Sequence, residues 1–117
     1  MNLKKLIPFI LFAFVLGSCG QSTHQQEGIV VQKKDDVNNL TEILLIPNIS
    51  EDEISNKNAE ELEDIAKNSN GAYYHFPRGE YKNLKVGTKI IVYWDGSQSA
   101  SSPPLRTADK IKEVSTQ

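Results

Sequence analysis

The chain has 117 residues, of which 38% are hydrophobic and 24% charged, an ordinary composition for one soluble domain with no room for a second. The formal net charge of -2 gives no general attraction to nucleic acids or other polyanions. The single cysteine, Cys19, excludes an internal disulfide bond.

The first 18 residues have the layout of a secretory signal. Lys4 and Lys5 precede an 11-residue apolar run, residues 6–16, and small residues follow it. Because a transmembrane helix needs about 20 apolar residues, we expect a signal helix that is cleaved rather than a permanent anchor. Its loss changes the formal charge from -2 to -4, since it holds two lysines and no acidic residue.

The end of this signal, Leu16-Gly17-Ser18-Cys19, resembles a bacterial lipobox. The resemblance implies cleavage before Cys19, whose thiol carries a diacylglyceryl group and whose amine carries a further acyl chain such as palmitate. Two chains hold a protein far more firmly than one, because each buried methylene contributes about 0.8 kcal/mol. We therefore expect a lipoprotein on the extracytoplasmic face of the cell membrane. An ordinary secretory signal with a free Cys19 thiol is the alternative.

Residues 19–27 are polar and predict a flexible tether, so we place the folded domain at residues 28–115. The β-branched run GIVVQKK, which ends before Asp35-Asp36, predicts a first strand. Asn38-Asn39 is typical of a turn, and the apolar run LTEILLIP predicts a second strand. Together these runs predict a β-hairpin.

One helix is expected in the domain, at residues 59–68. Asn58 and Glu61 have the spacing of a capping box, and the apolar residues that follow share one helical face. Ser50 and Glu53 repeat the capping-box spacing, which predicts a short helical turn before this helix.

Two further strands are expected after the helix. AYYHF, residues 72–76, is an aromatic run, in which Tyr73 and Tyr74 must point to opposite faces. TKIIVYWD alternates so that Thr88, Ile90, Val92 and Trp94 share one face.

Residues 96–104 contain no large apolar side chain and predict a solvated, mobile connection. In the last segment, TADKIKEV, the apolar residues Ala108, Ile111 and Val114 are three apart. This spacing is that of a helix, or of a strand interrupted by a β-bulge.

The order of these elements resembles the YobA-like family of small bacterial exported proteins, a domain of unknown function, over about Gly28 to Val114. The residues that carry the resemblance are Leu84, Val86, Gly87, Ile90, Ser101, Pro103, Ala108 and Ile111. The sequence departs from the pattern at Ser102, where an aromatic residue is expected. The resemblance implies a mainly β fold, a closed or partly closed OB-fold-like β-barrel with one short helix between strands and TADKIKEV as the last strand.

The sequence identifies no catalytic, cofactor-binding or metal-binding residue, and we predict no enzymatic activity. The serines of residues 96–102 do not form a nucleophile elbow. His24, expected in the tether, and His75, expected in a strand, lack the spacing of a zinc site. The acidic clusters lack EF-hand spacing, and the aromatic side chains are expected to fill the core.

Three functions remain open. The first is a non-enzymatic binding domain on the cell surface, whose partner is an unknown protein or envelope ligand. The second is an envelope-directed enzyme in which carboxylates such as Glu42, Glu80 or Asp95 converge in the fold. The third, an oligonucleotide-binding module, needs a basic face with exposed rings, and the acidic charge makes nucleic acid an unexpected partner.

Overall fold

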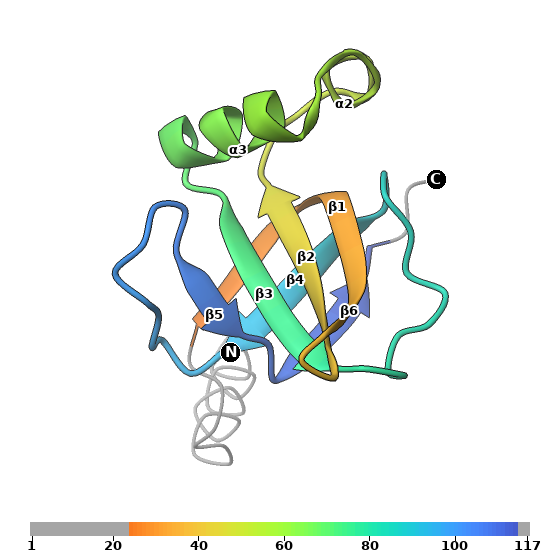
Figure 1. The fold of residues 1–117 in the computed structure, drawn as a ribbon, viewed down its shortest axis with the longest axis vertical. Helices are drawn as coiled ribbons and strands as arrows, with labels where there is room; N and C mark the ends of the chain where they lie inside the picture. Colours follow the sequence, from red (N-terminus) through yellow and green to blue (C-terminus); the bar gives the residue numbers. More distant parts are fainter. Residues whose placement is uncertain (1–23, 115–117) are drawn as a thin grey trace, which may run out of the picture.

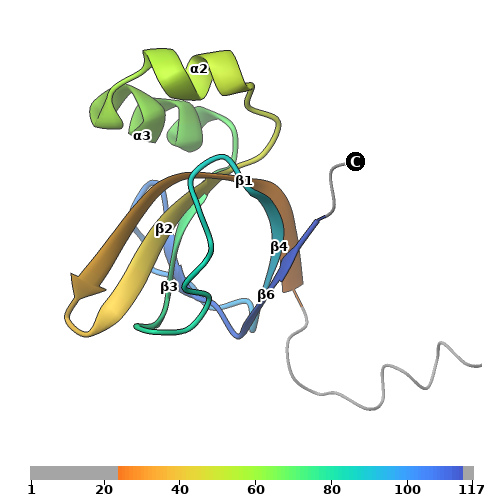
Figure 2. The same ribbon diagram turned by 90° about the vertical axis from the view of Figure 1, so that its right-hand side faces the viewer.

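A long, bent first strand shapes the part of the chain that the computed structural model describes, residues 24–114 (Figure 2). This strand, β1 (His24–Val37), pairs through its first half with β4 (Lys89–Trp94). Through its second half it pairs with β2 (Leu40–Ile46). Both pairings are antiparallel, so one strand joins the two halves of a single curled sheet.

The β1–β2 hairpin turns at Asn38-Asn39, as predicted. Both residues have positive φ angles, 57° and 68°, which asparagine tolerates better than most residues. A register shift between Val30 and Gln32 bends β1. At this bend Val30 points into the barrel core, and the next residue, Val31, belongs to a second apolar cluster on the opposite face of the sheet.

The first strand begins earlier than expected, because β1 starts at His24, four residues before the predicted start of the domain at residue 28. His24 to Glu27 are polar but pair with β4, from Trp94 to Ile91, so they are not part of a flexible tether. The strand also continues beyond Asp35 to Val37. Pairing with a neighbouring strand overrides the weak strand propensity of these residues.

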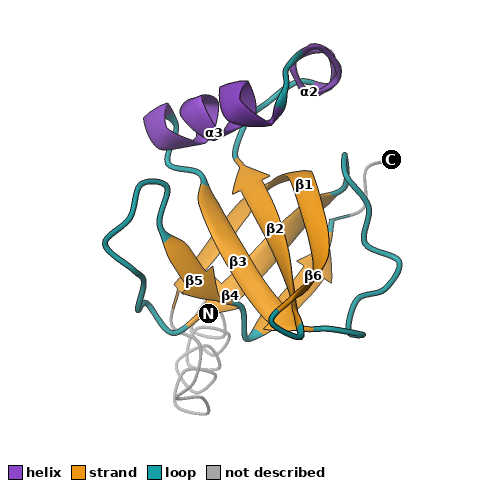
Figure 3. Ribbon diagram, in the orientation of Figure 1, coloured by secondary structure: helices purple, strands orange, loops and turns teal. Residues whose placement is uncertain are grey.

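Two helices separate β2 from β3 (Ala72–Pro77), instead of the single helix expected. They are α2 (Glu51–Asn56) and α3 (Ala59–Asn68), and both lie above one end of the sheet (Figure 3). The capping boxes read from the sequence, at Ser50 and Asn58, are both formed. The first box begins a separate six-residue helix, where the sequence predicts only a turn.

The helices cover a small apolar cluster on the outside of the sheet. It contains Val31, Leu44, Ile46, Ile49, Leu62 and Ala66. The backbone at Gly71, just after α3, lies so close to the helix that an added Cβ would be 2.7 Å from the Cβ of Ala66. Glycine is therefore required where the chain passes from α3 into β3.

The terminal segment consists of two short strands, which settles the choice between helix and strand. β5 (Leu105–Thr107) pairs in parallel with β3, and β6 (Lys110–Glu113) pairs antiparallel with β4. The resulting order, β5-β3-β2-β1-β4-β6, places the two strands at opposite edges of the sheet (Figure 1).

The break between β5 and β6 brings these edges together. The Ala108 amide donates to the His75 carbonyl of β3 at 2.9 Å, and the next amide, Asp109, donates to the Tyr93 carbonyl of β4 at 2.8 Å. One segment thus bonds first to one edge and then to the other. This arrangement confirms a mainly β, barrel-like fold similar to the OB-fold.

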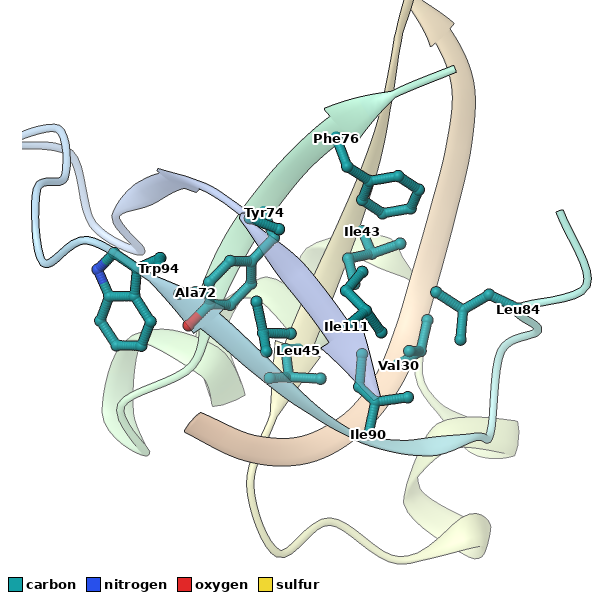
Figure 4. Close-up of a cluster of buried hydrophobic side chains, with 12 residues drawn as sticks. Val30, Ile43, Leu45, Ala72, Tyr74, Phe76, Leu84, Ile90, Trp94 and Ile111 are labelled. Atoms are coloured by element: carbon teal, nitrogen blue, oxygen red, sulfur yellow. The ribbon is translucent and has the colours of Figure 1, made fainter. Parts of the chain in front are cut away.

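The interior of the curl holds the main core (Figure 4). Its members are Val30, Ile43, Leu45, Ala72, Tyr74, Phe76, Leu84, Ile90, Val92, Trp94, Ala108 and Ile111. The predicted alternation of β4 is confirmed, because Ile90, Val92 and Trp94 are buried while Lys89 is exposed. Neither helix in residues 24–114 is long and apolar enough to cross a bilayer.

Candidate functional site

A polar pocket of about 670 Å³ lies at the turn of the β1–β2 hairpin. We call it the hairpin pocket. Its walls come from the ends of β1 and β2, from the turn between them, and from the loop that follows β3. The residues that line it are Lys33, Asp35, Asn39, Thr41, Arg78, Gly79, Glu80 and Lys82.

Lys33 connects β1 to the loop wall of the hairpin pocket. Its Nζ donates to the carbonyl of Leu84 at 2.9 Å and to that of Lys82 at 3.4 Å. A carbonyl is a neutral acceptor, so these bonds orient the ammonium group without cancelling its charge. The pocket therefore has a positioned positive charge on one wall.

The opposite charge comes from Asp35 and Glu80, which line the same pocket. Thr41, only 1% exposed, donates its hydroxyl to Oδ1 of Asp35 at 3.0 Å. This bond fixes the carboxylate against β2. With Lys33, Arg78 and Lys82 also in the lining, the pocket presents both signs of charge and suits a polar ligand rather than an apolar one.

The sequence prediction did not identify this pocket. The available signal was a change of character along the inward-facing positions of the hairpin. Ile43 and Leu45 of β2 are inward-facing core residues, whereas Thr41, at the next such position towards the turn, is polar. Lys33, opposite Ile43 on β1, marks the same change.

The three carboxylates considered for an enzyme do not converge. Glu42 lies on the outer face of β2, with Oε1 2.9 Å from Nε2 of His75. Glu80 lies in the hairpin pocket. Asp95 follows β4 and accepts bonds from the hydroxyl and the amide of Ser97, which lower the pKa of its carboxyl.

The two histidines have separate roles. His24 is in β1 rather than in a tether, and its ring lies 5.3 Å from that of Trp94. His75 is a strand residue, as expected, and forms a half-buried pair with Glu42. Across residues 24–114, no three His, Cys, Asp or Glu side chains gather in a way that could hold a metal ion.

The aromatic side chains are divided between the two faces of the sheet. Tyr74 is buried in the barrel, whereas Tyr73 points outwards and donates to Oε2 of Glu63 in α3 at 2.8 Å. Burial, and secondarily this contact with Glu63, raises the pKa of Tyr73. Tyr81 is 37% exposed and packs edge-on against the buried Phe76. The described aromatic side chains thus form no exposed stacking surface of the kind that an oligonucleotide binder needs.

Residues 96–104 are tied together by their own serines. The amide of Ser99 donates to the Leu105 carbonyl at 3.0 Å, and its Oγ accepts from the Leu105 amide at 2.9 Å. Ser101 donates to the Pro103 carbonyl at 3.0 Å, and Pro103 is buried. The connection is exposed from Ser97 to Ser102, as predicted, and these bonds hold it together. Cys19, the signal segment and residues 19–23 of the predicted tether lie outside the described residues.

A curled sheet closed by a broken terminal segment, with helices inserted after the second strand, defines a small OB-like β-barrel domain. The chain belongs to the family described as "Protein of unknown function (DUF3221)", whose model matches residues 27–115.

Two solved structures of YobA from Bacillus subtilis share the fold. The crystal structure is 25% identical, covers 81% of this chain and 100% of its own, and has a TM-score of 0.56. The NMR solution structure is 22% identical, covers 83% of this chain and 88% of its own, and has a TM-score of 0.57. No curated protein matches the chain. The YobA-like resemblance read from the sequence is therefore confirmed.

Proposed function

We propose that this chain is a lipid-anchored, non-enzymatic binding domain of the bacterial cell surface, and that its ligand enters the hairpin pocket. The observation that carries the proposal is the fixed arrangement of both signs of charge in one open pocket. The lipobox at Cys19 supports the anchor.

The contacts within the hairpin pocket favour recognition over catalysis. Asp35 accepts from the buried Thr41 hydroxyl, and Lys33 donates to backbone carbonyls, so a hydrogen bond orients each of these charged groups. A braced group loses little freedom when a ligand arrives. Ammonium and carboxylate groups of a peptide-like or amino-sugar ligand fit walls that carry Asp35 and Lys33.

The ligand class can be tested with the full chain in non-ionic detergent. We expect unprotected alanyl-alanine to shift the NMR signals of Lys33, Asp35 and Thr41, and the same dipeptide with both ends capped to shift them far less. Asp35→Asn, which keeps an oxygen for Thr41, should weaken binding about 10-fold, because hydrogen bonds to charged groups contribute roughly 1.5–3 kcal/mol. The matched control is Asp52→Asn, on the exposed start of α2. Equal shifts with the two dipeptides would contradict the proposal.

The anchor has its own test. We expect mass spectrometry of the membrane fraction to find Cys19 acylated, and Cys19→Ser to release the protein into the medium. An unmodified thiol on a secreted wild-type chain would refute the anchor and leave the pocket proposal standing.

The enzyme alternative keeps one specific observation, since Asp35 and Glu80 share the hairpin pocket. If the pocket is catalytic, the purified chain should hydrolyse cell-wall polymer, and Asp35→Asn with Glu80→Gln should abolish turnover while binding persists. A wild-type chain that binds without turnover would favour the binding domain.

A further inference from the structure

We propose that a second pocket, at the other end of β3, binds a phosphate group through Arg106. This cavity of about 260 Å³ lies between the end of α3, the 96–104 loop and β5. Its polar lining includes Lys67, Asn70, Gln98, Ser102 and Arg106. We call it the Arg106 pocket, and the proposal does not depend on what binds in the hairpin pocket.

The Arg106 guanidinium is held in one orientation. It lies over the indole of Trp94, 4.1 Å from the ring centroid, which is a close cation–π contact. Its Nε donates to Oε1 of Gln98 at 2.8 Å. Its Nη1 donates to Oε1 of Gln26 at 3.0 Å and to the hydroxyl of Tyr74 at 2.6 Å. These bonds engage Nε and Nη1 and fix the plane of the guanidinium.

The charge of Arg106 is not neutralised by these contacts. Among residues 24–114, its side chain donates to two amide oxygens and a phenol. Burial raises the pKa of Tyr74, an effect that outweighs the opposing influence of Arg106, so the phenol stays neutral. A half-buried cation without a counterion is poorly solvated, and an anion would offset that cost.

The rest of the lining favours the same ligand. Lys67 supplies a second cation, and its exposed pairing with Asp64 at 3.8 Å contributes little. The described lining contains no Asp or Glu, in contrast to the hairpin pocket. Asn70 and Ser102 add neutral hydrogen-bonding groups. Two cations and neutral donors match a phosphate group, which carries more than one charge and several acceptor oxygens.

The buried indole beneath Arg106 carries an unsatisfied donor. Nε1 of Trp94 is buried and has no hydrogen-bond partner within the described part of the chain. In Figure 4 this nitrogen is turned away from Leu45 and the other core side chains. Trp94 is also the only tryptophan of the sequence, so tryptophan fluorescence reports on the surroundings of this one indole, which the Arg106 guanidinium covers.

The test uses the full chain in dodecyl maltoside micelles at constant ionic strength. We expect inorganic phosphate, but not chloride, to change Trp94 fluorescence along a saturating curve. Arg106→Lys keeps the charge and loses the fork, and should weaken binding about 10-fold, the loss of one charged hydrogen bond. Lys67→Gln should weaken it about 3-fold, as expected for one partly screened charge. The matched control, Lys112→Gln on the exposed outer face of β6, should leave binding unchanged.

Two further probes identify the source of the phosphate. Glycerol phosphate represents soluble monoesters, and micelles containing phosphatidylglycerol represent lipid headgroups. An Arg106-dependent response to either one supports the site and names its source. The proposal is overturned if no phosphate probe acts beyond chloride, or if a folded Arg106→Lys variant responds like wild type. If Arg106→Lys does not fold, unchanged phosphate affinity in Lys67→Gln overturns it.

Discussion

The two ends of β3 open onto pockets that differ in how charge is handled. At the hairpin pocket, acidic and basic side chains share one lining, and Asp35 and Lys33 are braced by Thr41 and by backbone carbonyls. At the Arg106 pocket, the described lining contains no acidic residue, and Arg106 contacts neutral partners and an aromatic ring. The same strand therefore ends in a site lined by both signs of charge and in a site lined by cations without acidic residues, and we expect an anion to stabilise the second site more.

The largest expected effect contrasts the aromatic side chains at the two ends. Trp94→Ala should lower the free energy of unfolding by about 3–5 kcal/mol, because it empties a buried position and removes the surface beneath Arg106. Tyr81→Ala, at the more exposed ring, should cost roughly 2 kcal/mol, for the hydrogen bond that its hydroxyl accepts from the Ile111 amide and for the edge-on contact with Phe76. Urea unfolding followed by circular dichroism measures both. Equal losses in the free energy of unfolding would show that Trp94 and Tyr81 contribute equally to stability.

Next in size are two hydroxyl deletions, one at each end. Tyr74→Phe should destabilise the domain by about 1–3 kcal/mol, since Arg106 and Gln26 both lose a partner. Thr41→Val should cost about 1 kcal/mol, because Asp35 can turn to water in the open hairpin pocket. Thermal unfolding at neutral pH compares them, and a larger loss for Thr41→Val would reverse the ranking of the two networks.

Substitutions at Asn39, in the turn of the hairpin pocket, should change the stability less, and the sign of the change depends on the new residue. Asn39 has a φ of 68°, so Asn39→Ala should destabilise by about 1 kcal/mol, whereas Asn39→Gly should be neutral or stabilising by a few tenths. Amide hydrogen exchange of β1 and β2 detects the change. If both substitutions weaken the hairpin equally, the Asn39 side chain matters more than its backbone conformation.

The smallest expected effect concerns the loop that builds the Arg106 pocket. Ser97 holds the pKa of Asp95 below its ordinary value of 3.8, so the Ser97 contact adds stability above that pH and loses it as the pH falls through the lowered pKa. Ser97→Ala should bring the pKa of Asp95 back towards 3.8. NMR titration of the Asp95 carboxyl carbon in the wild type and in Ser97→Ala measures it. An unchanged Asp95 titration would assign the shift to another cause.

Local chemistry made part of this molecule predictable. Asn38-Asn39, the capping boxes and the alternation of β4 each act over a few residues, and each was read correctly. The strand at His24 to Glu27 escaped prediction because its stability comes from pairing with β4 rather than from its own side chains.

The candidate sites depend on contacts too distant in sequence for a local pattern to indicate. Arg106 meets Gln26 across 80 positions and Tyr74 across 32. Lys33 reaches Leu84 across 51. The fold class followed from a family resemblance and local patterns, whereas the assembly of either pocket required the closed barrel.

The early start of β1 limits how far the domain can travel. Only four residues separate Cys19 from His24, and five extended peptide steps span at most about 18 Å. If Cys19 is acylated as proposed, the barrel stays within this short distance of the membrane surface. Its accessible volume is a shallow shell over the headgroups, and any partner must come down into that shell to be captured.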